Sequence, residues 1–112
     1  MPSSSDIAEI SASSLEYVRV TVSAVASGSA INPTADTVTM AFMTSGTPAS
    51  GDLKTASWET DATTEPDTYY ARCLVGTGGA VTLAAGVVYT VWVKVTDNPE
   101  VVLRRAGRLR VI

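Results

Sequence analysis

The stretch from Val87 to Thr96 reads VVYTVWVKVT, and its side chains alternate between two kinds. Valine or tyrosine occupies every odd position, whereas the even positions after Val88 carry threonine, tryptophan or lysine. A period of two is typical of a β-strand with one face in a core and the other in water. The Asp-Asn-Pro sequence that follows favours a turn and ends the strand. One large aromatic residue, Trp92, therefore stands on the face that should be wet.

The same alternation recurs along most of the chain, and Gly- and Pro-rich loops separate its segments. The further segments counted as strands are 15–24, 36–44, 54–60, 68–75, 80–83 and 101–112. About seven short strands with turns between them and no helical periodicity predict an all-β protein, an antiparallel β-sandwich. The shared parity predicts one core, made of Val18, Val20, Val22, Val38, Met40, Phe42, Trp58, Val91, Val93 and Leu109.

The last strand is interrupted at Ala106-Gly107, where the apolar register shifts between Leu103 and Leu109. Either a β-bulge or a short hairpin would explain the shift. A bulge is the preferred interpretation, because alanine is unfavourable in a turn position that needs positive φ.

Residues 1–14 differ from the rest, since they are rich in serine and weakly apolar. We predict a flexible, extended N-terminal arm over 1–14 and a sandwich domain over 15–112. A floppy tail is one interpretation, because chain termini are often loose. The other is an arm that becomes ordered only against a neighbouring protein, with Ile7 and Ile10 as its apolar contacts.

Composition restricts the chemistry. The 112 residues suit one domain, and they contain no histidine, so histidine-based catalytic triads and histidine zinc sites are excluded. Cys73, the one cysteine, falls on the inward face of a strand, which predicts a buried and inert thiol. The GTGG sequence at 76–79 lacks the lysine of a phosphate-binding loop and predicts a tight turn. We therefore predict no enzymatic activity, no catalytic residues and no cofactor.

Several carboxylates gather in a loop-rich stretch, namely Asp52, Glu59, Asp61, Glu65 and Asp67. Their spacing is not that of a calcium-binding loop, so a solvated acidic face is preferred over a metal site. The net charge of −3 argues against nucleic acid as a partner. The chain has no run of eighteen apolar residues and no basic, apolar leader at its start, so we expect neither membrane insertion nor a signal peptide.

The arginines gather at the other end, because Arg104, Arg105, Arg108 and Arg110 lie in the last nine positions. Segregated charge of this kind suits contacts between protein subunits, although a solvated strand face is the simpler explanation. Trp92 is either half covered by a loop or by the arm, or it contacts another protein. The residues predicted to bind partners are Ile7, Ile10, Trp92, Lys94, Arg104, Arg108 and Arg110.

Roughly the C-terminal half of the chain resembles small Ig-like virion proteins of tailed bacteriophages, most clearly from Leu83 onward. The similar features are a leucine and glycine before Tyr-x-Val-Trp-Val, then an Asp-x-Pro-Glu turn and a final strand ending in Gly-x-Leu. The positions that carry them are Leu83, Gly86, Tyr89, Val91, Trp92, Val93, Asp97, Pro99, Glu100, Gly107 and Leu109. The stretch YYARCLVGTGG at 69–79 also fits the phage form.

This resemblance implies an Ig-like sandwich and a non-enzymatic structural role in a phage particle, as a head decoration, neck or tail component. The implied partners are other capsid, neck or tail proteins and further copies of the chain, and the implied location is the virion after synthesis in the cytoplasm of the host bacterium. An alternative function is an Ig-like module that binds carbohydrate or a host surface.

Overall fold

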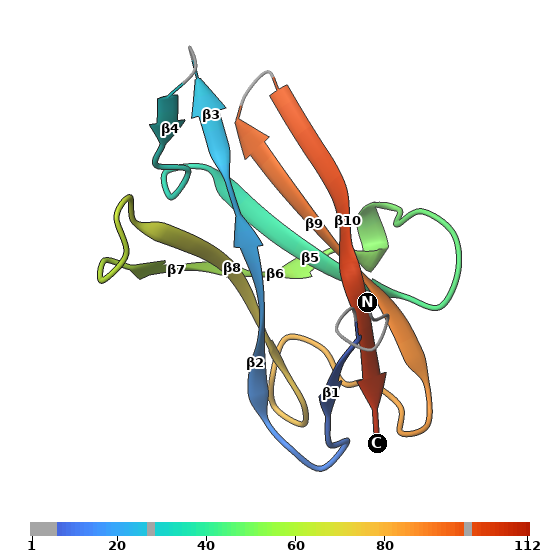
Figure 1. The fold of residues 1–112 in the computed structure, drawn as a ribbon. Coiled ribbons are helices and arrows are strands. Elements are labelled where there is room, and N and C mark those ends of the chain that lie inside the picture. Colours follow the sequence, from blue (N-terminus) through green and yellow to red (C-terminus); the bar gives the residue numbers. More distant parts are fainter. Residues whose placement is uncertain (1–6, 27–28, 98–99) are drawn as a thin grey trace.

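A computed structural model describes residues 7–26, 29–97 and 100–112 of the chain. Within these residues the protein is all-β, as predicted, and its helical structure is one short 3-10 helix, η2 (Ser50–Asp52). Two larger sheets face each other, and a small two-stranded sheet extends from one end (Figure 1). Residues 1–6 of the predicted arm and the predicted turn at Asn98-Pro99 lie outside the described residues.

The larger sheet, called sheet A here, has five strands in the spatial order β1-β10-β9-β5-β6. These strands are β1 (Ile7–Ile10), β10 (Glu100–Val111), β9 (Val88–Asp97), β5 (Thr37–Met43) and β6 (Lys54–Thr55). The pair β1–β10 is parallel, whereas the other neighbours in sheet A are antiparallel.

Sheet B has three antiparallel strands in the order β2-β8-β7. They are β2 (Glu16–Val22), β8 (Thr68–Val75) and β7 (Ser57–Asp61). The small third sheet is the hairpin of β3 (Ala24–Ala26) and β4 (Ser29–Ile31), so part of the segment that the sequence predicted as a loop pairs as strands.

The core lies between sheets A and B and confirms the predicted parity. Met40 of β5 and Leu109 of β10 are 0% and 1% exposed, and they pack with inward residues of β2, β8 and β9. Of the ten predicted core residues, six are buried: Val18, Val38, Met40, Val91, Val93 and Leu109. The other four, Val20, Val22, Phe42 and Trp58, are partly buried and pack against them.

The segment predicted as a single third strand is instead two strands in different sheets. Lys54 pairs with Met40 in sheet A, whereas Trp58 pairs with Ala71 in sheet B. The chain changes sheets at Ala56, which packs against the core. A strand that bends across from one sheet to the other closes one side of the two-sheet structure. Period-two parity does not reveal such a bend, because each half keeps its own alternation.

The interruption in the last strand is a β-bulge, as preferred. Arg105 pairs with Trp92 and Gly107 with Val91, so Ala106 is the extra residue. The chain continues as one strand through this point and does not turn back as a hairpin.

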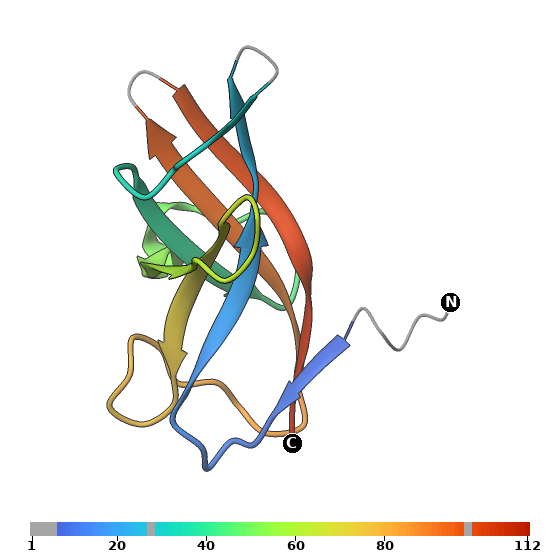
Figure 2. The same ribbon diagram turned by 60° about the vertical axis from the view of Figure 1, so that its left-hand side comes forward.

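Residues 7–14 differ from the predicted arm. β1 pairs with the C-terminal end of β10 (Figure 2), and Ile10 is buried in the core at 8% exposure. The backbone continues this attachment, because Ile112 N donates to Ile10 O and Ala12 N donates to Ile112 O. In this structure residues 7–10 are therefore a strand of the fold, which differs from the predicted flexible arm. Burial of Ile10 and pairing with the edge of β10 stabilise this segment. Its polar composition did not predict this stabilisation.

Candidate protein-binding surfaces

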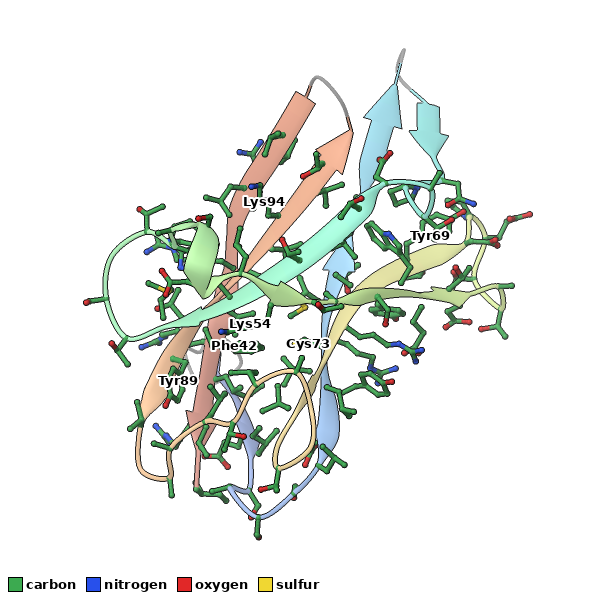
Figure 3. The ribbon with its side chains drawn as sticks, turned by 180° about the vertical axis from the view of Figure 1, so that it is seen from behind. Phe42, Lys54, Tyr69, Cys73, Tyr89 and Lys94 are labelled. Atoms are coloured by element: carbon green, nitrogen blue, oxygen red, sulfur yellow. The ribbon has the colours of Figure 1, made fainter. Side chains whose placement is uncertain are left out.

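The face of sheet A that points away from sheet B carries Trp92, the residue that the sequence analysis left open. Strand pairing places Ala41 and Arg105 on either side of it on the same face. Ala41 is 0% exposed, and the indole Nε1 of Trp92 is buried without a hydrogen-bond partner in the described structure. The segment containing η2 lies on this side of the sheet and contacts β5 (Figures 1 and 3). These observations favour coverage by a loop of the chain itself.

The bulge places the arginines of the last nine positions on two different faces of β10. Residues that pair directly across neighbouring strands share a face, so Arg105, Arg108 and Lys94 lie on the outer face of sheet A with Trp92. Arg104 pairs with the core residue Val93 and thus points to the opposite face. The extra residue Ala106 causes this exchange, because a bulge shifts the alternation by one position.

The other residues predicted to bind partners lie at separate places in the structure. Arg110 lies on the outer face of sheet A, where its guanidinium is 3.0 Å from Glu9 Oε2 of β1. Ile10 is buried in the core, so it is not available as an apolar contact in this structure. The backbone of Ile7 pairs with Arg108 at the start of β1. The predicted set is thus not one site.

A second surface, which the sequence analysis did not select, lies on the outer face of sheet B. We call it the Tyr–Arg face and define it by Tyr17, Arg19, Glu59, Tyr70 and Arg72. Their neighbours in sequence, such as Val18 and Ala71, point into the core, so these five side chains point outward. Tyr17 is 46% exposed.

The side chains of the Tyr–Arg face form one connected network. The Arg72 guanidinium carbon lies 4.3 Å from the ring centre of Tyr17, and that of Arg19 lies 5.4 Å from the ring centre of Tyr70. Glu59 joins the two halves, because its carboxylate is 2.9 Å from Arg19 Nη1 and 3.4 Å from Arg72 Nη1. Arg72 Nε also donates to Ser57 Oγ at 3.1 Å.

This network stabilises the fold only weakly but orders the surface. Exposed ion pairs and cation–π contacts contribute roughly 0–1 kcal/mol each. Their larger effect is to hold two long arginine side chains in place, which reduces the entropy lost when a partner binds. Tyrosine and arginine are also enriched at the centres of protein interfaces. With two arginines and one glutamate, the face keeps one net positive charge.

One signal of this face was visible in the sequence. Tyr17 and Arg19 share parity in one strand, and Tyr70 and Arg72 share parity in another. Sequence spacing could not show that β2 and β8 are neighbours, nor that β7 brings Glu59 beside them. The network exists only through this strand order.

The carboxylates of the loop-rich stretch do not converge. Glu59 belongs to the network above, Asp52 Oδ2 accepts from Ala49 N, and Asp61 accepts from the hydroxyl and backbone N–H of Thr63. These Thr63 hydrogen bonds lower the pKa of the Asp61 carboxyl. In the described parts of the chain no three metal-binding side chains form a group, and no helix is long and apolar enough to span a membrane.

Cys73 lies between the sheets at 1% exposure (Figure 3), and its Sγ is 3.5 Å from Thr55 O. Burial raises the pKa of this thiol to about 11, and nearby Lys54 opposes the shift only in part. A thiol with a raised pKa holds little of the nucleophilic thiolate at neutral pH. The geometry thus agrees with the predicted inert, buried cysteine.

We expect Cys73 of the folded protein to react with iodoacetamide at pH 8 about 100-fold more slowly than in guanidinium chloride, since a shift of about two pKa units removes most thiolate. Mass spectrometry of the alkylated chain over time measures both rates. Equal rates would show that the thiol is accessible.

Because the folded pKa is raised above 9.0 to about 11, the thiol's contribution to stability is complete below pH 9 and is lost as pH rises to 11. The variant Cys73→Ala should lack this part of the pH dependence.

No protein family, curated protein or solved structure matches this chain.

Proposed function

We propose that the chain is a non-enzymatic structural component of a bacteriophage particle, located in the virion and made in the cytoplasm of the host bacterium. It binds other virion proteins, and the Tyr–Arg face is its main contact surface. The phage assignment rests on the resemblance of the C-terminal half to small Ig-like virion proteins. The observation that supports binding is the ordered network of two tyrosines, two arginines and one glutamate on an outward sheet face.

The proposed architecture is an Ig-like sandwich. One supporting feature is the hydroxyl of Tyr89, which accepts a hydrogen bond of 2.9 Å from the backbone N–H of Ala84. Ig-type sandwiches carry a similar corner, in which a tyrosine at the start of a strand bonds to backbone a few residues upstream. Tyr89 is also one of the residues that carry the resemblance.

Binding through the Tyr–Arg face is tested with Tyr17→Ala and Arg72→Ala, added as purified proteins to phage particles that lack this chain. We expect the wild type to sediment with the particles. Each variant should bind at least about 30-fold more weakly, because interface residues of this kind commonly contribute 2 kcal/mol or more. Arg72→Lys should also bind weakly, since lysine keeps the charge but not the planar stacking on Tyr17.

The matched control is Thr47→Ala, an exposed position in the loop beside sheet A. This variant should sediment like the wild type, and circular dichroism should show that all four variants are folded. Full particle binding by both alanine variants would contradict the role of this face. Failure of the wild type to bind any particle component would contradict the proposed function itself.

A second candidate is the carbohydrate-binding module. The 46% exposure of Tyr17 favours it, because sugars stack on exposed aromatic rings and hydrogen-bond to neighbouring polar groups. Arg72 occupies one face of that ring, which leaves at most the other face for a sugar. Binding of the purified chain to a glycan array, lost in Tyr17→Ala, would favour this function over the first.

A further inference from the structure

The upper part of β10 is an open sheet edge. β10 pairs with β9 over most of its length, but β1 covers its other side only from Arg108 to Val111. Among the described residues, no strand of sheet A lies beside residues 101–105 on that side. Figures 1 and 2 show this part of β10 at the border of the sheet, beyond the end of β1.

The backbone groups that face the open edge can be identified. Val111 N donates to Val87 O on the β9 side, whereas Ile112 N donates to Ile10 O on the β1 side. Donors therefore alternate along β10, and the bulge at Ala106 shifts the alternation by one residue. By this count the N–H and C=O groups of Val101, Leu103 and Arg105 point away from β9, toward the open edge.

Positively charged side chains flank the same edge. Arg104 and Arg105 are exposed on opposite faces of β10, and Arg108 follows on the face of Arg105. Edge arginines discourage pairing with neutral or basic strands, including β10 of a second copy. They do not discourage a strand that carries carboxylates.

The molecule itself contains an example of the favoured arrangement. β1 adds in parallel to the lower part of this edge, and its Glu9 lies directly opposite Arg110. The two side chains form an ion pair of 3.0 Å across the strands. An added strand with a carboxylate beside an edge arginine is thus already accommodated on β10.

We propose that the open edge of β10 binds an extended acidic segment of another protein by strand addition. The segment hydrogen-bonds to Val101, Leu103 and Arg105, and its carboxylates lie beside Arg104 and Arg105. Backbone pairing supplies affinity in this mode, and the side-chain charges supply specificity. A protein strand is favoured over nucleic acid because the edge offers alternating backbone donors and acceptors. This surface is separate from the Tyr–Arg face, so the two proposals can fail separately.

The test uses the whole chain and a fluorescein-labelled peptide, Thr-Glu-Val-Glu-Val-Glu-Val-Thr, with fluorescence anisotropy as the readout. We expect saturable binding that weakens as salt rises, because screening reduces the charge attraction. Leu103→Pro removes one outward N–H and should weaken binding at least about ten-fold, since a strand edge needs its donors. The matched control Leu103→Ala removes the same side chain, keeps that N–H and should bind like the wild type. Arg104→Glu combined with Arg105→Glu should abolish binding.

Two further probes make the outcome decisive. A peptide with lysine in place of glutamate should not bind, and a glutamate peptide with N-methylated alternate amides should bind at least about ten-fold more weakly. The N-methylated peptide decides the matter on the wild-type chain if Leu103→Pro does not fold. The proposal is overturned by equal binding of the two glutamate peptides, by equal binding of the lysine peptide, or by no binding at about 1 mM. A twelve-residue oligothymidylate that binds while the glutamate peptide does not would reassign the edge to nucleic acid.

Discussion

Replacing Gly76 with alanine should destabilise the protein more than any other single methyl addition considered for its turns. A Cβ atom at this position would overlap Ser14 O and lie 2.9 Å from Leu15 Cα, both of which are backbone atoms. The φ angle of +132° is also one that side-chain-bearing residues rarely adopt. Overpacking and backbone strain each cost about 1–3 kcal/mol, so we expect a loss of roughly 2–6 kcal/mol.

Gly78 supplies the matched control in the same turn. It also has positive φ, at +89°, but a Cβ atom there would meet nothing within 4 Å. Gly78→Ala should therefore lose only the conformational part, about 1–2 kcal/mol. Urea unfolding followed by circular dichroism gives both free energies. Equal losses for the two variants would show that the close approach of Ser14 to this turn does not hold in solution.

Replacing Leu109 with alanine should lower the free energy of unfolding by about 2–5 kcal/mol, as buried leucines commonly do. The side chain is 1% exposed and belongs to the main cluster between the sheets. Leu109 follows the bulge in β10, so its burial depends on the strand register after the bulge. A loss of this size is a large share of a typical stability of 5–15 kcal/mol.

Val101→Ala is the control for that experiment, because Val101 lies in the same strand and is 53% exposed. It should lose less than about 0.5 kcal/mol, as most surface substitutions do. Denaturation of both variants under the same conditions compares them directly. If Val101→Ala proved as damaging as Leu109→Ala, the orientation of β10 would be wrong.

Local alternation predicted most of the longer strands and their inward faces, although it did not predict β1 or the division of 54–60 between two sheets. Alternation in 15–24 and 87–96 predicted which valines pack together, because a strand presents successive side chains to opposite sides whatever it pairs with. The bulge was predictable as well, since a shift of apolar register needs an extra residue. These are properties of a few neighbouring residues.

The neighbours of each strand are set by packing between distant segments, and the candidate surfaces depend on that strand order. Glu59 lies 40 residues from Arg19 in the chain, yet their side chains are 2.9 Å apart because β7 and β2 both flank β8. The bend at Ala56 and the docking of β1 on β10 are likewise set by contacts between distant segments. A strand's alternation records that one face is buried but carries no record of its partner. The bulge shows the same limit within one strand, since its position was visible while the face that each arginine occupies required the pairing with β9.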